Sequence, residues 1–113
     1  MKRPSGGRGA QLAAVAPLLN EITQTVLYDK VWERPELSKR DRSLITIVTL
    51  IALGREQVEG HMELGIENGL TVEELGETIA HMAFYAGWPV ATTAARKLMN
   101  VAKVGSEGTT AEG

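Results

Sequence analysis

The chain of 113 residues carries a formal net charge of −2 and is 43% apolar, a composition typical of one small globular domain. A charge near zero indicates neither nucleic acid nor an anionic membrane as a partner, and no apolar run approaches the roughly 20 residues that span a bilayer. Cysteine is absent and the two histidines lack the spacing of a metal site, so we expect no disulfide, no thiol chemistry and no bound transition metal.

The two ends of the chain differ in composition from its middle. Residues 1–9 combine Gly, Pro and basic residues, which predicts a flexible N-terminal arm. No apolar core follows the basic start, so we expect no signal peptide and a cytoplasmic protein. Residues 104–113 are mostly small or polar and predict a disordered tail. One helical domain over residues 10–103 remains.

The first part of this domain predicts a helix and then a connector. Residues 11–16 could be helical, whereas Pro17 fits best at the first position of a helix that runs to about Asp29. The apolar residues of this second segment follow helical spacing. Residues 32–37 are expected to form a connector, because Pro35 disfavours a helical conformation at the residue before it.

A central helix follows the connector. Residues 44–53 read LITIVTLIAL, apolar on nearly every side, and predict a helix that other helices cover all around. Ser38 is suited to be its N-cap, with Asp41 three residues later as an acidic form of the capping box. Gly54 can adopt the positive φ that ends such a helix.

Three further helices are predicted after the central one. Residues 56–68 form the first of them. Thr71, with Glu74 three residues later, makes a capping box that opens the next helix, and Gly87 ends it. Pro89 fits the first position of the last helix. No segment alternates steadily between apolar and polar residues, so the fold class is all-α, a small bundle of about five helices.

Several motifs occur in an order and spacing that resemble the carboxymuconolactone decarboxylase family. Residues 32–46 read W-x-R-P-x-L-x-x-R-x-R-S-L-I-T, and A-L-G-R-E and a histidine follow. Residues 68–75 read NGLTVEEL, and residues 81–89 read H-x-x-x-Y-A-G-W-P. The resemblance covers most of the chain and implies the helical fold of the alkylhydroperoxidase-D-like superfamily, in its cysteine-free branch.

The resemblance implies a cofactor-free decarboxylase that acts on a small lactone carboxylate, 4-carboxymuconolactone, in aromatic compound degradation. It also implies a homotrimer or homohexamer with pockets between subunits. The residues alone support only an oligomer, because one small chain cannot bury this many apolar helix faces. Related thiol reductases carry C-x-x-C-x-x-x-H, whose thiols would fall at Gly54 and Gln57, so thiol peroxidase activity has no nucleophile here.

Two residues are the catalytic candidates. His61 matches the family's most characteristic histidine, and the resemblance implies that it donates a proton, which suits a side chain that titrates near neutral pH. The alternative is a partly buried structural histidine. Arg42 matches the family's basic signature and is implied to bind a carboxylate or a developing oxyanion, since its planar fork binds two oxygens at once. Arg40 is two residues earlier and points to another side of the helix.

The other candidates, all for substrate binding, are Arg34, Arg40, Glu56, Trp32, His81, Tyr85 and Trp88. Each has a structural alternative. Arginines beside a cap can be solvated or paired with nearby acidic residues, Glu56 can interact with a helix dipole, and the tryptophans can be core or interface anchors. His81 and Tyr85 are four apart on one helical face and can line a pocket or pack at an interface, with the interface favoured.

Two positions depart from the family members most like the true decarboxylase. Those members read H-I-R where this chain reads His61-Met62-Glu63, and Trp88 stands where a smaller residue is frequent. An acidic residue beside the proton donor disfavours a dianionic substrate. The alternative function is therefore a non-catalytic oligomeric module that binds a small molecule.

Overall fold

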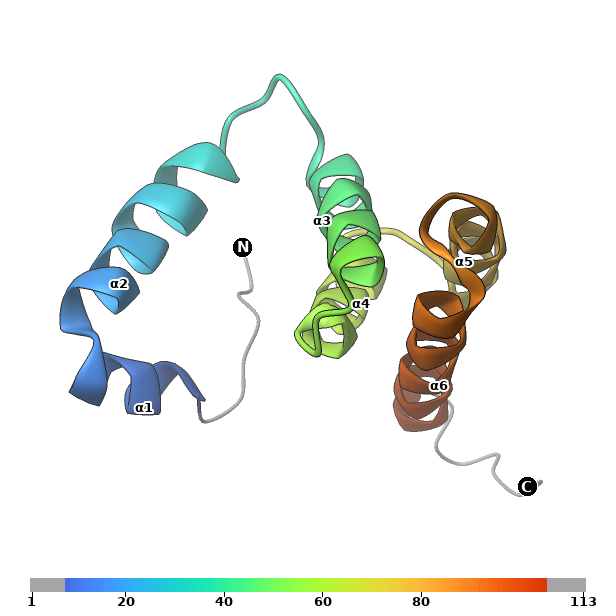
Figure 1. Ribbon diagram of the computed structural model, residues 1–113. Helices are drawn as coiled ribbons and strands as arrows, with labels where there is room; N and C mark the ends of the chain where they lie inside the picture. The colour runs from blue at the N-terminus through green and yellow to red at the C-terminus, as the bar shows by residue number, and fades with distance from the viewer. Residues whose placement is uncertain (1–7, 106–113) are drawn as a thin grey trace.

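The fold is all-α, as predicted. The computed structural model describes residues 8–105, which contain six α-helices, one π-helix and no strand. In chain order these are α1 (Arg8–Val15), α2 (Pro17–Ile22), η1 (Thr23–Val31), α3 (Lys39–Leu53), α4 (Val58–Glu67), α5 (Val72–Ala86) and α6 (Trp88–Gly105) (Figure 1). None of these helices has the combined length and apolar character needed to cross a bilayer. The predicted flexible arm and disordered tail lie mostly outside the described residues, although residues 8–9 belong to α1 and residues 104–105 to α6.

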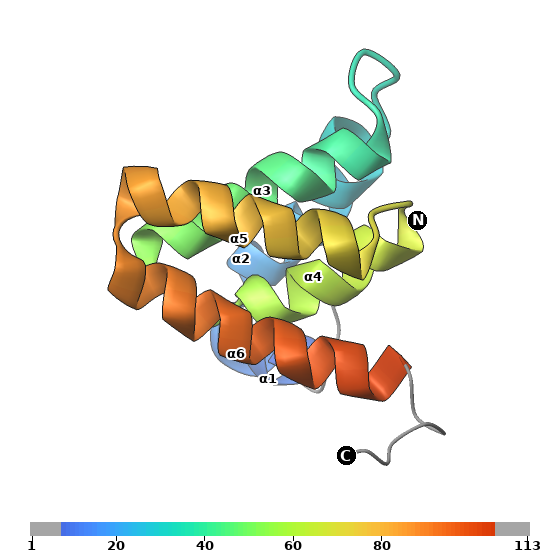
Figure 2. The same ribbon diagram turned by 90° about the vertical axis from the view of Figure 1, so that its right-hand side faces the viewer.

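The helices form two parts, a four-helix bundle of α3 to α6 and an arm beside it. In the bundle, α5 packs against α6, α4 packs against α3 and α6, and α3 also contacts α5. The arm consists of α1, α2 and η1, and Figure 1 shows it on one side of the bundle, joined to α3 by residues 32–38. Figure 2 shows α5 lying across the opposite side of the bundle, with no other helix in front of it.

Apolar side chains from the bundle helices make the core. Ile47 and Ile51 of α3, Met62 of α4 and Leu75 of α5 are almost completely buried. Burial of this apolar surface is the main force that holds the four helices together. The buried residues of α4 and α5 pack against Ile47 and Ile51 of α3 in this core.

Helix α3 also approaches α4 very closely. A Cβ atom added at Gly65 would lie 2.9 Å from Leu70 Cδ1 and 3.1 Å from Ile47 Cδ1, so only glycine fits without displacement of these side chains. The buried hydroxyl of Ser43 accepts a hydrogen bond of 3.0 Å from Asn68 Nδ2. This bond satisfies a polar group inside the contact between the two helices.

The ends of α3 are as predicted. Ser38 Oγ accepts a hydrogen bond of 3.0 Å from the Asp41 backbone N–H, and Gly54 ends the helix with φ 67°. The expectation that other helices cover α3 on every side is wrong within one chain, because Ile45 and Leu53 are exposed. Residues 8–105 of a single chain supply no helix for that side.

The starts of α4 and α6 differ from the prediction, whereas that of α5 agrees with it. Glu56 precedes α4 instead of starting it, because residues 54–57 form a turn that the bond from Val58 N–H to the Arg55 carbonyl closes at 3.3 Å. The capping box that opens α5 is confirmed in both directions, with Thr71 and Glu74 exchanging two hydrogen bonds of 3.0 Å. Helix α6 begins at Trp88, one residue before the predicted start.

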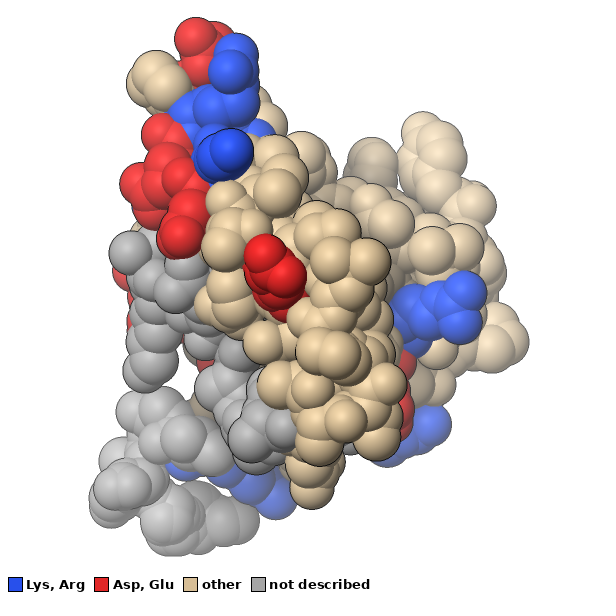
Figure 3. All heavy atoms as spheres, turned by 90° about the vertical axis from the view of Figure 1, so that its left-hand side faces the viewer, with Lys and Arg blue, Asp and Glu red and all other residues tan. Residues whose placement is uncertain are grey.

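The arm carries a long apolar surface with little cover. The predicted helix from Pro17 extends to Val31, but its second half is a π-helix whose last bond runs from Trp32 N–H to the Leu27 carbonyl at 2.9 Å. Most of the large apolar side chains of the arm are exposed: Leu12, Val15, Leu18, Leu19, Ile22, Val26, Leu27 and Val31. Figure 3 shows this outer face, where charged side chains gather at the top, over the connector, and much of the remaining surface is uncharged.

Candidate functional site

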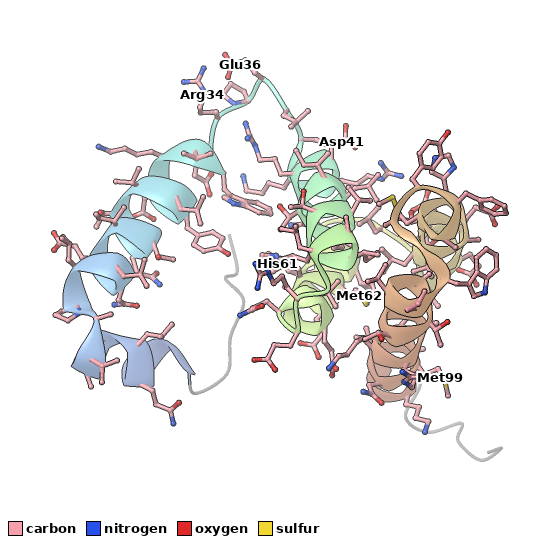
Figure 4. The ribbon with its side chains drawn as sticks, viewed as in Figure 1. Arg34, Glu36, Asp41, His61, Met62 and Met99 are labelled. Carbon is pink, nitrogen blue, oxygen red and sulfur yellow. The ribbon has the colours of Figure 1, made fainter. Side chains whose placement is uncertain are left out.

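His61 lies on the side of α4 that faces the arm (Figure 4). The ring is half-buried, and its Nδ1 atom is buried with no hydrogen-bond partner among the described residues. Burial lowers the pKa of His61 below its ordinary value, because the charged form loses solvation. The histidine is therefore mainly neutral at pH 7, and its Nδ1 atom is shielded from solvent without a hydrogen-bond partner among the described residues.

One aromatic ring of the connector covers this histidine, and a ring of the arm supports it from behind. Trp32 stacks on His61 with ring centroids 6.4 Å apart and an interplanar angle of 28°. Tyr28 packs behind Trp32 at 5.6 Å, and both rings are buried together with Leu64 of α4 in a cluster separate from the main core. This cluster links the arm to the bundle and excludes water from one face of the imidazole.

Arg42 of α3 contacts the connector. Its Nη2 atom donates a hydrogen bond of 3.2 Å to the carbonyl of Arg34, while its Nε atom is buried and has no partner within residues 8–105. Since Trp32 touches His61 and Arg34 touches Arg42, the connector contacts both catalytic candidates. Each of the two candidates thus has a buried nitrogen without a partner among the described residues, and each contacts the connector.

Arg40 occupies the other side of α3, as helical geometry predicted. Its guanidinium binds Glu74 Oε2 and Asp41 Oδ1, both at 3.0 Å. The hydrogen bond with Glu74 is the main reason that the pKa of Arg40 is raised, and the Thr71 backbone N–H, followed by Arg40, lowers the pKa of Glu74. Two carboxylates already partner Arg40, which makes it a link between α3 and α5 more than an anion-binding residue.

A surface groove lies between α3 and α5, away from His61. It has a volume of about 440 Å³ and its walls are mainly apolar; the residues around it are Arg40, Leu44, Val48, Leu70, Glu74, Glu77, Thr78, His81 and Met82. His81 stacks on Tyr85 with ring centroids 4.9 Å apart, and the Tyr85 ring is exposed. The two histidines of the chain therefore lie on different surfaces of the bundle.

The remaining candidates are spread over the molecule. Arg34 lies at the top of the connector with its side chain beside Glu36, an ion pair of 3.5 Å, and Figure 4 shows it pointing outward, away from His61. Glu56 lies in the exposed turn before α4. Trp88 packs against Phe84 at 5.5 Å where α5 meets α6, so it belongs to a different cluster from Trp32.

Two residues of the cluster beside His61, Tyr28 and Leu64, were not predicted from the sequence. The four-residue spacing of Tyr28 and Trp32 was the available indication, because side chains at that spacing lie on one helical face. Nothing in the sequence indicated that the arm would bring these rings onto α4. Among the described residues, no group of His, Asp or Glu side chains is arranged to hold a metal ion.

Comparisons with known proteins agree with this architecture. Residues 17–100 match the model of the carboxymuconolactone decarboxylase family. A 4-carboxymuconolactone decarboxylase of Acinetobacter baylyi is 44% identical over 68 residues, which cover 59% of this chain and 51% of that protein. A nitrosuccinic acid decarboxylase of Metarhizium robertsii is 38% identical over 70 residues, covering 61% of this chain and 49% of that protein. The chain spans about half the length of these relatives. Most of its length matches the family model, and the chain belongs to the carboxymuconolactone decarboxylase family.

Proposed function

We propose that the protein is a cofactor-free decarboxylase of a small organic acid, with His61 as proton donor and Arg42 as anion-binding residue. The observation that carries the proposal is the pair of buried, unpartnered nitrogens, His61 Nδ1 and Arg42 Nε, beside the connector. Buried polar groups without a partner are rare and point to a function, and oxygens of a bound acid would satisfy both. Family membership and the names of both relatives support decarboxylation as the reaction type.

The reaction needs stabilisation of negative charge and delivery of one proton. When the bond to the carboxylate breaks, carbon dioxide leaves and its electron pair moves through the substrate to a carbonyl oxygen. The positive charge of Arg42 stabilises that oxygen, or holds the carboxylate before it leaves. His61 then gives a proton to the carbon and regains one from solvent, so charge and atoms balance.

The lowered pKa of His61 is compatible with this role. In the unliganded protein the ring is neutral because burial disfavours its charge. A bound carboxylate brings negative charge into the same place and favours the imidazolium form, so the histidine takes up a proton as the substrate binds. Trp32 keeps the ring desolvated, which strengthens its interaction with the substrate's charge.

The substrate proposed is a lactone carboxylate such as 4-carboxymuconolactone, which the name of the Acinetobacter relative suggests, in aromatic compound degradation. The lactone carbonyl would receive the electrons. Arg34 and Trp32 belong to the connector that touches the catalytic pair, whereas His81, Tyr85 and Trp88 could join a pocket only across a subunit boundary. We propose a cytoplasmic homotrimer or homohexamer as the working form.

Spectroscopy of a substrate panel tests this function. Decarboxylation of a muconolactone changes the conjugation of its ring, so turnover changes the ultraviolet spectrum. The protein should consume at least one lactone carboxylate without added metal or redox cofactor, and Arg42→Lys should raise KM more than it lowers kcat, because lysine keeps the charge and loses the fork. Absence of turnover across carboxylated lactones and small dicarboxylic acids would contradict the proposal.

Non-catalytic binding of the same ligands is the second candidate. Glu63, two residues after His61 in the sequence, favours it, because a negative charge on this helix adds no attraction for a multiply charged transition state. Calorimetry separates the two functions. Saturable heat of binding that Arg42→Lys weakens, with an unchanged ligand recovered afterwards, supports a binding module; release of carbon dioxide supports the enzyme.

A further inference from the structure

Tyr28 is the one buried residue in the arm. No other residue from Gln11 to Val31 is buried, whereas Tyr28 is only 6% exposed. Helices α1 and α2 make their main contacts within the arm, α1 with α2 and α2 with η1. The buried contact between the arm and the rest of the chain is therefore made by this one ring.

The Tyr28 ring supports the indole that covers His61. The ring centroids of Tyr28 and Trp32 are 5.6 Å apart, and Trp32 in turn stacks on His61 at 6.4 Å. Leu64, three residues after His61 and on the same face of α4, is buried in the same cluster. A continuous series of contacts thus runs from η1 through Trp32 to α4.

The backbone of η1 directs both rings of the arm and connector toward α4. Trp32 ends η1, and its N–H donates a hydrogen bond of 2.9 Å to the Leu27 carbonyl, so the π-helix sets the orientation of the indole. Tyr28 lies four residues earlier, a spacing that places two side chains on one helical face. π-Helical turns are rare and are frequent at functional sites. This one ends at the residue that covers His61.

We propose that Tyr28 is a positioning residue, which holds the Trp32 ring against His61 and thereby orients the imidazole and keeps water from it. A functional histidine is commonly oriented by a hydrogen bond to its second nitrogen. His61 Nδ1 has no such partner among residues 8–105, so the stacked indole takes over this task. Tyr28 acts on the histidine through Trp32.

The surroundings of His61 make the effect of Tyr28 measurable. Burial is the only cause that lowers the pKa of His61, and no charged side chain of the described part of the chain contributes. Water that reaches the ring would solvate the imidazolium and raise the pKa toward its ordinary value of 6.5. A tyrosine that only anchors the arm predicts a different result: its loss would lower stability and leave the His61 titration unchanged.

Titration of the histidine ring protons by nuclear magnetic resonance tests the proposal without a substrate. The two histidines give two signals, which His61→Gln assigns, and the His81 signal is the internal reference. Tyr28→Leu should raise the His61 pKa toward 6.5, whereas Tyr28→Phe keeps the ring and should match the parent. Val26→Ala, at an exposed position of the same π-helix, is the matched control and should also match the parent.

Three results would overturn the proposal. The first is an unchanged His61 titration in folded Tyr28→Leu, or in Tyr28→Met should the leucine variant not fold. The second is an equal shift in Tyr28→Phe, which would assign the effect to the hydroxyl and not to the ring. The third is additivity: in a Trp32→Leu background Tyr28→Leu should add little, because both changes remove the same cover, and a full additional shift would show that Tyr28 does not act through Trp32.

The consequence for catalysis rests on the proposed function. On a confirmed substrate, Tyr28→Leu should lower kcat by up to ~10²-fold and change KM little, because the proton donor is misplaced while Arg42 still binds the acid. The limb of the kcat/KM profile that reports His61 should move to higher pH. Normal kcat in a Tyr28→Leu protein with a shifted titration would overturn this catalytic role. Absence of turnover by the parent would contradict the proposed function alone, since the titration needs no substrate.

Discussion

At the scale of single residues, burial of His61 gives the protein's stability a pH dependence. The folded-state pKa of His61 lies below its unfolded value, so between these two values the unfolded chain binds more protons. Stability is therefore full above the unfolded pKa of about 6.5 and is lost as pH falls through the window down to the folded value. The urea midpoint should decrease between pH 7.5 and pH 5.5, and His61→Gln should reduce that decrease. An equal decrease in the variant would show that other groups cause it.

Alanine substitutions at two glycines of α4 test how tightly this helix packs, because one position is crowded and the other is open. Gly65→Ala forces a Cβ against Leu70 and Ile47 and should destabilise the fold by about 1–3 kcal/mol, the usual cost of overpacking. Gly60→Ala meets no atom within 4 Å and should stabilise the helix by about 0.5–1 kcal/mol. Urea unfolding of both variants measures the difference, and a neutral Gly65→Ala would mean that the side chains of Leu70 and Ile47 shift aside without cost.

Helical geometry alone predicted that the two arginines of α3 would lie on different sides of the helix. Arg40 and Arg42 are two apart and do face opposite sides of α3, one toward Glu74 and the other toward the Arg34 carbonyl. The pairing of Trp32 with His61 could not be predicted in the same way. Spacing within a helix defines its faces, whereas the contact between the connector and α4 depends on how separate elements pack.

At the scale of elements, side-chain caps were the most reliable indication in the sequence. Ser38 and Thr71 each fix a helix start because a short hydroxyl side chain can bond an N–H that the helix leaves unpaired. The start of α4 has no such side-chain bond at Gln57, and its predicted start was wrong by two residues. The π-helix also escaped prediction. Apolar spacing does not distinguish a π-helix from an α-helix.

The capping box of α5 gives a prediction at this scale. Thr71→Ala should cost about 1 kcal/mol, because the Glu74 N–H loses its partner. Arg40→Ala should have a much smaller effect, since its ion pair with Glu74 is exposed to solvent and screened. Thermal unfolding of the two variants checks this order. A larger loss for Arg40→Ala would mean that the link between α3 and α5 matters more than the cap.

At the scale of the whole molecule, large apolar side chains are exposed on the arm, on the Ile45 side of α3 and at the aromatic end of α5, among other places. This distribution explains why the sequence predicted more burial than one chain provides. The protein should therefore be an oligomer at micromolar concentration in light scattering. A stable monomer under these conditions would contradict that prediction and, with it, the proposed working form.

The central claim is that chemistry depends on His61, and an exposed residue of α6 provides its control. His61→Asn keeps a similar size and a hydrogen-bonding group but removes the titratable proton, so kcat on a confirmed substrate should fall by ~10²–10⁴ if His61 is the proton donor. Thr93→Ala, an exposed substitution on α6 outside every candidate site, should leave kcat per folded subunit within about threefold of the parent. Measured on variants with unchanged helical content, a full loss in His61→Asn alone supports the account. Normal turnover by folded His61→Asn would contradict it.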